Sequence, residues 1–302
     1  MKWPEGRSFA FTVFDDPDAQ TLGASREIYA LLDDLGFRTT KGVWMIEPPE
    51  RNSGGDTCEA PDVLEHALQL QQRGFEIAYH NGAPGTLPRD QIIRSLDLFR
   101  ARFGHDPISM ANHYNEDAVY WGAARLSGAA RAVYRAATRR NGRFFGHVEG
   151  HPSFWGDICR QRIRYCRNFV FRRVNTLAAC PHMPYADPER PYVQAWYASA
   201  EGAQCPSYVE RLGDREIDRL EEERGACIMY THFGHGFVRD GRLDAEFKRV
   251  MTRLAARNGW FVPVATLLDH LAARRGVHVL TPGERRRLEW SWLPAKLLHG
   301  TS

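Results

Sequence analysis

The stretch Ser8-Phe-Ala-Phe-Thr-Val-Phe-Asp-Asp16 decides the fold. Residues 9–14 are almost wholly apolar, β-branched or aromatic, which is typical of a strand buried on both faces in a parallel sheet. The strand runs into Asp15 and Asp16, and Pro17 helps to end it. Because neighbouring strand residues point to opposite sides, we expect these two carboxylates to have different surroundings. Carboxylates at the C-terminal end of a buried parallel strand are where α/β barrels keep their chemistry, although an Asp-rich turn explains the same pattern.

Beyond this stretch, short apolar segments alternate with amphipathic ones along the chain. Their spacing predicts a single-domain distorted (β/α) barrel of about seven strands over residues 1–279, with long loops at about 149–213. A doubly wound sheet is the alternative, but it normally shows a Gly-rich turn after the first strand. Residues 280–302 form an Arg- and Trp-containing tail that either packs back or serves as an interaction segment. We expect further strands at 38–44, 75–79, 108–112, 144–148, 168–174, 226–231 and 260–264, and helices at 19–36, 61–73, 88–103, 118–137, 242–257 and 265–274.

The composition of the 302-residue chain narrows the class of protein. A hydrophobic fraction of 43% and a net charge of +3 are ordinary for a globular domain. The Arg-rich segments are scattered, which disfavours nucleic acid as a partner. Six cysteines without CxxC spacing predict reduced thiols. No apolar run reaches transmembrane length and no apolar signal region precedes Phe9, so we expect a cytoplasmic protein without a membrane span.

Several predicted strands end in residues that bind metals. Asp15 and Asp16 follow the first strand, and His80, His113 and His232 follow three later ones. The C-terminal ends of barrel strands converge on one face, so these side chains are expected to meet there. A mixture of nitrogen and oxygen ligands suits a divalent ion such as zinc and leaves a spare carboxylate as a base. A structural role explains any one of these histidines equally well.

Three motifs resemble the polysaccharide deacetylase superfamily. The segment Phe11-Thr-Val-Phe-Asp-Asp16 resembles its T-F-D-D motif, Gly74-Phe-Glu-Ile-Ala-Tyr-His80 its G-x-E-I-x-x-H motif, and Ile228-Met-Tyr-Thr-His232 its last motif. The resemblance implies a distorted (β/α) barrel with fewer strands than a regular one. It also implies removal of N- or O-acyl groups from sugars with one divalent metal ion. The roles that it implies are a general base for Asp15, metal ligation for Asp16 and His80, and a general acid for His232.

The chain departs from that family's pattern at two places. The family's second metal-binding histidine lies four residues after the first, where this chain has Pro84. Its third motif, which includes an arginine, is replaced by Ala111-Asn-His-Tyr-Asn115, so the arginine that orients the base has no clear counterpart. We expect His113 to supply the missing ligand. Two alternatives stay open, namely that His235 is the ligand and that the site has lost its metal.

The long loops suggest how a substrate is held. Residues 149–157 and 181–188 combine aromatic side chains with carboxylates and imidazoles, the combination with which proteins bind sugars. The alternative is that the aromatic residues simply cover the end of the barrel. The substrate contacts expected from the sequence are Asn112, His151, Trp155, Tyr185 and His235.

These expectations combine into one function. The chain is predicted to be a zinc-dependent hydrolase that removes an N-acyl (acetyl) group from an amino sugar, sugar nucleotide or glycan precursor in polysaccharide biosynthesis. Its partner is a small-molecule or oligosaccharide substrate, and self-association is compatible with the sequence. The first alternative is a catalytically altered or inactive carbohydrate-binding relative. The second is an assembly protein of glycan synthesis that docks through its tail.

Overall fold

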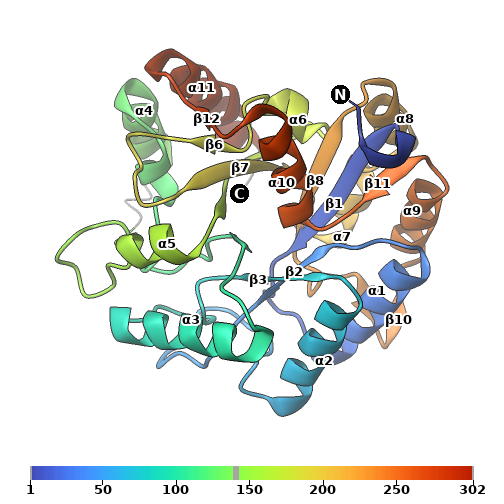
Figure 1. The fold of residues 1–302 in the computed structure, drawn as a ribbon, viewed down its shortest axis with the longest axis horizontal. Coiled ribbons are helices and arrows are strands. Elements are labelled where there is room, and N and C mark those ends of the chain that lie inside the picture. The colour runs from blue at the N-terminus through green and yellow to red at the C-terminus, as the bar shows by residue number, and fades with distance from the viewer. Residues whose placement is uncertain (1, 139–142, 301–302) are drawn as a thin grey trace.

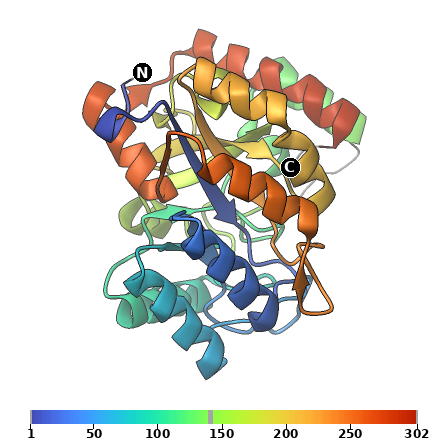
Figure 2. The same ribbon diagram turned by 90° about the vertical axis from the view of Figure 1, so that its right-hand side faces the viewer.

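A computed structural model of the chain describes residues 2–138 and 143–300. Within these residues, parallel strands close a seven-stranded barrel because β8 pairs with both β7 and β1. Figure 1 shows the barrel with its surrounding helices, and Figure 2 shows β1 running through the interior between them. The barrel strands in spatial order are β1 (Phe9–Asp15), β2 (Thr40–Val43), β3 (Glu76–Tyr79), β4 (Ser109–Met110), β5 (Tyr165–Phe171), β7 (Ala195–Glu201) and β8 (Ala226–Thr231). The predicted barrel of about seven strands is confirmed.

The remaining strands are short, and three of them extend the sheet of the barrel. β11 (Gly259–Phe261) pairs with the first half of β1, whereas β2 pairs with its last two residues. β6 (Tyr185–Ala186) runs antiparallel to β7, and β12 (His278–Val279) adds to β6. β9 (Val238–Arg239) and β10 (Arg242–Leu243) form a separate hairpin.

The helices surround the barrel, and some of them begin at capping side chains. Thr21 caps α1 through its hydroxyl, and Thr281 and Glu284 form a capping box at the start of α11. The helices are α1 (Leu22–Asp34), α2 (Pro61–Gln72), α3 (Arg89–Phe103), α4 (Gly128–Thr138), α5 (Gly156–Arg162), α6 (Thr176–Ala179), α7 (Cys205–Arg211), α8 (Asp214–Glu222), α9 (Ala245–Ala255), α10 (Val264–Arg275) and α11 (Pro282–His299). None of the helices in the described chain is both long enough and apolar enough to cross a membrane. The cellular location stays a prediction.

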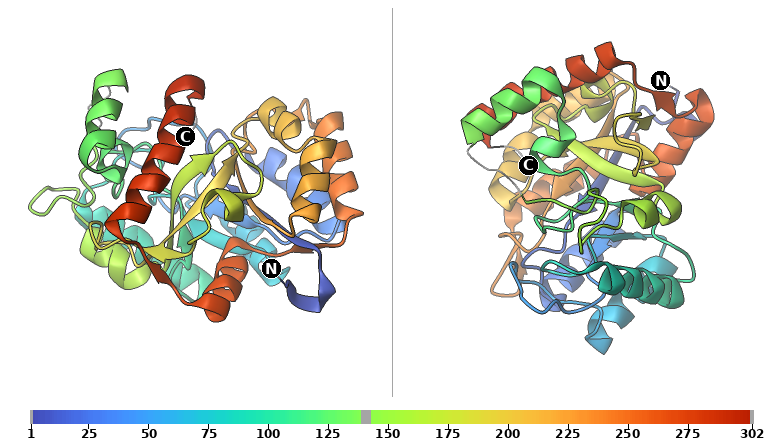
Figure 3. Two further views of the ribbon diagram at one scale, coloured as in Figure 1. Left: turned by 90° about the horizontal axis from the view of Figure 1, so that it is seen from above. Right: turned by 90° about the vertical axis from the view of Figure 1, so that its left-hand side faces the viewer.

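The segment after residue 279 packs back onto the barrel. It forms α11, which lies beside α4 in both views of Figure 3 and also contacts β5. Leu288, Trp292 and Leu293 are its buried apolar side chains. Of the two uses considered for this tail, packing back is the one that the structure shows.

Two sequence-based expectations about the middle of the chain are wrong. Residues 144–148, expected as a strand, form turns and loop. β7 was not anticipated, although residues 195–200 are all buried. The expected helix at 118–137 begins only at Gly128 and is preceded by a loop and the 3₁₀ turn Gly122–Arg125. β7 combines small residues with the adjacent Trp196 and Tyr197 and lacks the alternation of polar and apolar residues that reveals a half-buried strand.

Candidate metal centre

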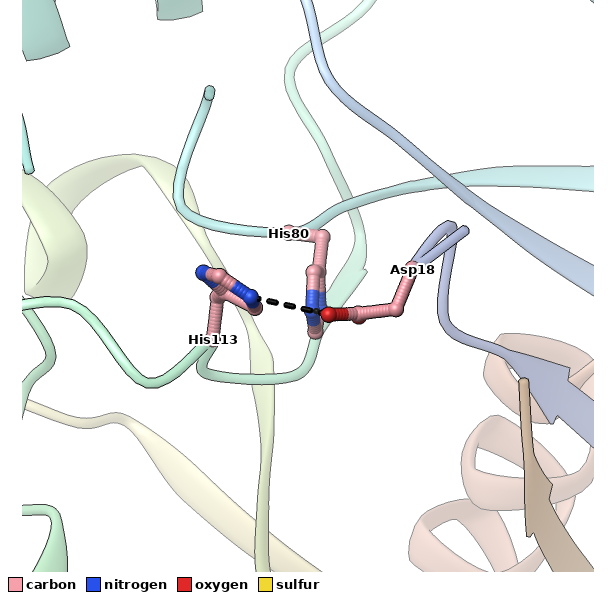
Figure 4. A group of neighbouring side chains, drawn as sticks. All are labelled: Asp18, His80 and His113. Carbon is pink, nitrogen blue, oxygen red and sulfur yellow. Dashed lines mark hydrogen bonds and ion pairs between the residues drawn. The ribbon is translucent and has the colours of Figure 1, made fainter. Parts of the chain in front are cut away.

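Three side chains from three strand-end loops meet at the C-terminal mouth of the barrel. They are Asp18 after β1, His80 after β3 and His113 after β4, and one ligand atom from each lies within 4.8 Å of the others. Figure 4 shows the three side chains pointing toward one another. Nε2 of His113 lies 2.9 Å from Oδ1 of Asp18, and Nε2 of His80 lies 3.3 Å from Oδ2 of Asp18. In a tetrahedral site with bonds of about 2 Å, ligand atoms lie roughly 3.3 Å apart, so this spacing suits a single ion.

The hydrogen bonds around the cluster fit metal ligands. Both ring nitrogens of His80 and Oδ2 of Asp18 are buried without a hydrogen-bond partner, which is costly unless a further group satisfies them. Asn115 donates its amide hydrogens to Ala83 and Gly85, so its Oδ1 is turned toward Nδ1 of His113 at 2.8 Å. That bond orients the His113 ring and places its proton on Nδ1. The Nε2 atom is therefore left as the ligand atom.

The electrostatics of the cluster are strongly coupled. Burial alone raises the pKa of Asp18, but the hydrogen bond from His113 and the close approach of the His80 ring outweigh it and hold the pKa far below its usual range. Burial lowers the pKa of His113, and the bond to Asp18 more than reverses this. Two imidazoles around one ionised carboxylate form a ligand set of the kind that binds zinc and similar ions.

A tight turn places Asp18 over the barrel. Gln20 N donates to Pro17 O, and Ala19 N donates to Gly54 O, so the chain folds back directly after β1. Gly234 lies against this turn, and a Cβ at position 234 would lie 2.4 Å from Asp18 O. In the sequence, Asp18 is one of the residues of the Asp-rich turn around Pro17. The signal that could have identified it is the third carboxylate just after Pro17.

Asp16 lies beside the cluster but is committed to an arginine. Nη1 and Nη2 of Arg167 on β5 bind its two oxygens at 2.9 and 2.5 Å. The nearest approach of Asp16 to His80 is 3.9 Å. The structure therefore puts Asp18, rather than Asp16, between the two histidines. Arg167, which the sequence did not single out, fixes the orientation of the Asp16 carboxylate.

Asp15 points away from the cluster into the protein. Its carboxylate accepts hydrogen bonds from Gln20, Tyr29 and the backbone N–H of Phe233, and Nζ of Lys41 lies 3.7 Å from it. Asp15 and Lys41 are both buried, and burial raises the pKa of Asp15 despite these partners. The strand alternation correctly predicted different surroundings for Asp15 and Asp16. The alternation by itself does not determine which of the two carboxylates faces the cavity.

His232 follows β8 and reaches the same mouth. Its Nε2 lies 4.0 Å from Oδ2 of Asp16 and 3.8 Å from Oδ2 of Asp18. Nδ1 lies 3.0 Å from the carbonyl oxygen of Ala203, so Nδ1 carries a proton and donates it there. Nε2, which also lies 3.0 Å from the hydroxyl of Tyr230, is then the atom that can exchange a proton at the site.

A cavity of about 260 Å³ opens beside these groups. Its wall includes Asp16, Asp18, His80, His113 and His232, and it continues toward α4 and α11. Aromatic and cationic side chains complete the wall, namely Tyr114, Trp121, Arg125, Tyr134, Phe144, Arg167, Tyr230 and Lys296. Such a mixture of aromatic faces and polar groups is suited to a polar ring compound such as a sugar.

The expected substrate contacts are only partly at this cavity. Asn112 lines it, but its amide is bonded to the backbone of Val119. Trp155 is fully buried and donates to Asp117 O, and Tyr185 is 1% exposed with its hydroxyl bonded to Asn168. These two aromatic residues are core residues, which corrects the expectation from their loops.

The two remaining expected contacts are histidines outside the cavity wall. His151 stacks on Phe145 with 4.0 Å between ring centroids. His235 lies 5.2 Å from the His232 ring and is not among the residues of the Asp18 cluster. Of the two candidates for the additional ligand, His113 is the one that the fold brings to His80.

The comparisons with known proteins agree with the fold. No family model and no curated protein matches the chain. Among solved structures, the chain is similar to a protein of Mycobacterium smegmatis named as a candidate polysaccharide deacetylase, with 13% identity, 93% of this chain and 96% of that chain covered, and a TM-score of 0.54. It is also similar to a GH57 branching enzyme from Thermococcus kodakaraensis, with 12% identity, 90% and 72% covered, and a TM-score of 0.50. Identity this low carries the fold and not the activity, and on that basis the chain has a polysaccharide deacetylase-like (β/α) barrel.

Proposed function

We propose that this protein is a metal-dependent hydrolase that removes an N-acyl group, such as acetyl, from an amino sugar, sugar nucleotide or glycan precursor. The observation that carries the proposal is the cluster of Asp18 with the buried His80 and His113, beside a carboxylate that Arg167 fixes in place. The fold is compatible with this chemistry, and the cavity beside the cluster offers room for a small polar substrate.

Asp18, His80 and His113 would hold one divalent ion, with zinc the best match to two imidazoles and a carboxylate. Such an ion supplies an electrophile for the acyl carbonyl and lowers the pKa of a bound water. Asn115 keeps the His113 ring in the orientation that this requires.

Asp16 is the residue best placed to accept a proton from water. Each carboxylate oxygen has two lone pairs, so the two bonds from Arg167 leave acceptor capacity facing the cavity. Arg167 also fixes the carboxylate against rotation, which keeps its free lone pairs aimed at one point. Asp15, the base expected from the sequence, lacks this access because its carboxylate is buried among Gln20, Tyr29 and Lys41. Asp16 would therefore act as the base and Asp18 as the metal ligand.

His232 is the candidate proton donor to the leaving amine. The Ala203 carbonyl holds the Nδ1 proton, so a second proton on Nε2 would face the cavity. Its position 4.0 Å from Asp16 places a proton acceptor and a proton donor side by side at the site. Hydrolysis of an amide needs both, because water loses a proton and the amine gains one.

The test is amide hydrolysis by the purified protein. The protein is treated with a chelator, reloaded with zinc and incubated with N-acetylglucosamine, its uridine diphosphate conjugate and chitin oligomers. We expect equal amounts of acetate and primary amine from at least one of them, dependent on zinc. We also expect Asp16→Asn to remove this activity while zinc is retained, and the exposed Asp62→Asn to leave it unchanged. Stoichiometric zinc without hydrolysis of any of these amides would contradict the proposal and favour a carbohydrate-binding role.

A further inference from the structure

One buried arginine lacks the partner that the other buried arginines have. Among the described residues, the buried arginines are Arg125, Arg167, Arg190 and Arg285, each 4% exposed or less. The last three are paired with carboxylates, which offset the cost of removing a guanidinium from water. Those carboxylates are Asp16 for Arg167, Asp187 and Glu289 for Arg190, and Asp187 and Glu189 for Arg285. No ion pair within the described chain involves Arg125.

Arg125 is held between two indole rings. Its guanidinium carbon lies 4.0 Å from the ring centroid of Trp121 and 4.7 Å from that of Trp292 on α11. Nη1 donates to the carbonyl oxygen of Asn168 at 2.9 Å, and Nε is buried without an acceptor. Burial lowers its pKa to about 10, so the group still carries its charge at neutral pH. The indoles fix the plane of the guanidinium but provide no negative charge.

Arg125 lines the same cavity as the candidate metal centre. Besides Arg125, the wall contains Arg167 and Lys296 as cations and Asp16 and Asp18 as carboxylates. Arg167 is already paired with Asp16. Asp18 lies against His80 and His113, so neither carboxylate of the wall pairs with Arg125.

We propose that the substrate carries an anionic group, a carboxylate or a phosphate, that binds Arg125 while its acyl group lies at the Asp18, His80 and His113 cluster. The proposal rests on the proposed function for the acyl end, and its own basis is the uncompensated guanidinium in the cavity wall. A planar guanidinium with a fixed orientation donates two parallel hydrogen bonds to either anion. Neutral acetamido sugars would leave that charge unpaired and are expected to bind more weakly.

Binding measurements test this without requiring turnover. Calorimetric titrations of the zinc-loaded protein use N-acetylglucosamine, N-acetylglucosamine 6-phosphate and N-acetylmuramic acid, which are neutral, phosphorylated and carboxylated ligands. We expect at least one anionic ligand to bind about 10- to 100-fold more tightly than the neutral sugar, the range of a charge-assisted hydrogen-bond pair. The phosphate and the carboxylate are distinguished by which of the two is preferred.

Variants assign the preference to Arg125. Arg125→Met should remove most of the preference, with the affinity for the neutral sugar changed less than about threefold. Arg249→Met removes the same charge from the exposed face of α9 and should change nothing. Should Arg125→Met fail to fold, Arg125→Lys keeps the charge but lacks the two parallel N–H donors of the guanidinium, and it is expected to show an intermediate preference. The proposal would be overturned if the wild type bound neutral and anionic ligands with equal affinity. It would also be overturned if the preference for anions survived in folded Arg125→Met or was undiminished in Arg125→Lys. The binding titration is independent of the acetate-release assay. A protein that prefers anionic ligands but releases no acetate would refute the proposed hydrolysis and leave this inference standing.

Discussion

The substitution Asp15→Asn tests whether Asp15, at the end of β1, stabilises the fold or takes part in catalysis. The substitution keeps the shape of the side chain and removes its charge. Lys41, 6% exposed at its side chain and 3.7 Å from Asp15, would then be a buried ammonium without its carboxylate. The new amide group would also face Gln20 and Tyr29, which both donate to Asp15. Removing one partner of a buried pair costs about 3–5 kcal/mol, so we expect the free energy of unfolding to fall by that amount.

Urea unfolding followed by tryptophan fluorescence measures this loss, and the unfolding temperature should fall by roughly 6–10 °C. The turnover of the folded variant should stay within about threefold of the wild type, since Asp15 does not face the cavity. Asp34→Asn, at an exposed position on α1, is the matched control and should unfold like the wild type. An Asp15→Asn protein as stable as the wild type but about 100-fold slower would refute the reasoning and return Asp15 to the role of base.

Three other substitutions test separate parts of the structure. His232→Ala should retain the metal and lower kcat by about 10²- to 10⁴-fold, as measured by acetate release, and loss of the metal instead would make His232 a ligand. Burial and the charges of Lys41 and Arg26 lower the pKa of His66 to about 4. Between about pH 6.5 and 4 the unfolded chain therefore binds a proton that the folded chain does not, and stability falls as the pH falls through that window. Between pH 7 and pH 5, the loss of stability measured by urea unfolding should be about 2 kcal/mol smaller in His66→Asn than in the wild type, and an equal loss in the two proteins would exclude His66 as a source. Trp292→Ala should lower the free energy of unfolding by about 3–5 kcal/mol in the same assay, because its indole is fully buried. Trp290 is 44% exposed on the same helix, so Trp290→Ala should lower it by less than about 0.5 kcal/mol. Similar losses in the two variants would contradict the packing of α11.

The sequence predicted the parts of the fold and site that depend on local pattern. β1 appears as a continuous apolar run, and His80 and His113 follow strands whose ends must converge in a closed parallel barrel. A strand end is defined by neighbours in the chain, so these positions can be found without the structure.

The parts that were missed depend on contacts between distant segments. Arg167 meets Asp16 across 151 positions of sequence, and no local signal relates them. Asp18 reaches the histidines through a turn anchored by the backbone of Gly54. Trp155 and Tyr185 belong to segments with the composition of a sugar-binding loop, but their burial depends on the elements that pack over them.

The central claim is that Asp18, His80 and His113 hold one divalent metal ion, and its position in a crystal tests this most directly. Crystals grown with zinc would be measured on both sides of the zinc absorption edge, and an anomalous difference map would locate the ion. The account predicts one strong peak about 2 Å from Asp18 Oδ, His80 Nε2 and His113 Nε2, with Asp16 still bound to Arg167. A peak ligated by Asp16 with Asp18 turned away, or no peak at this cluster at full zinc loading, would contradict it.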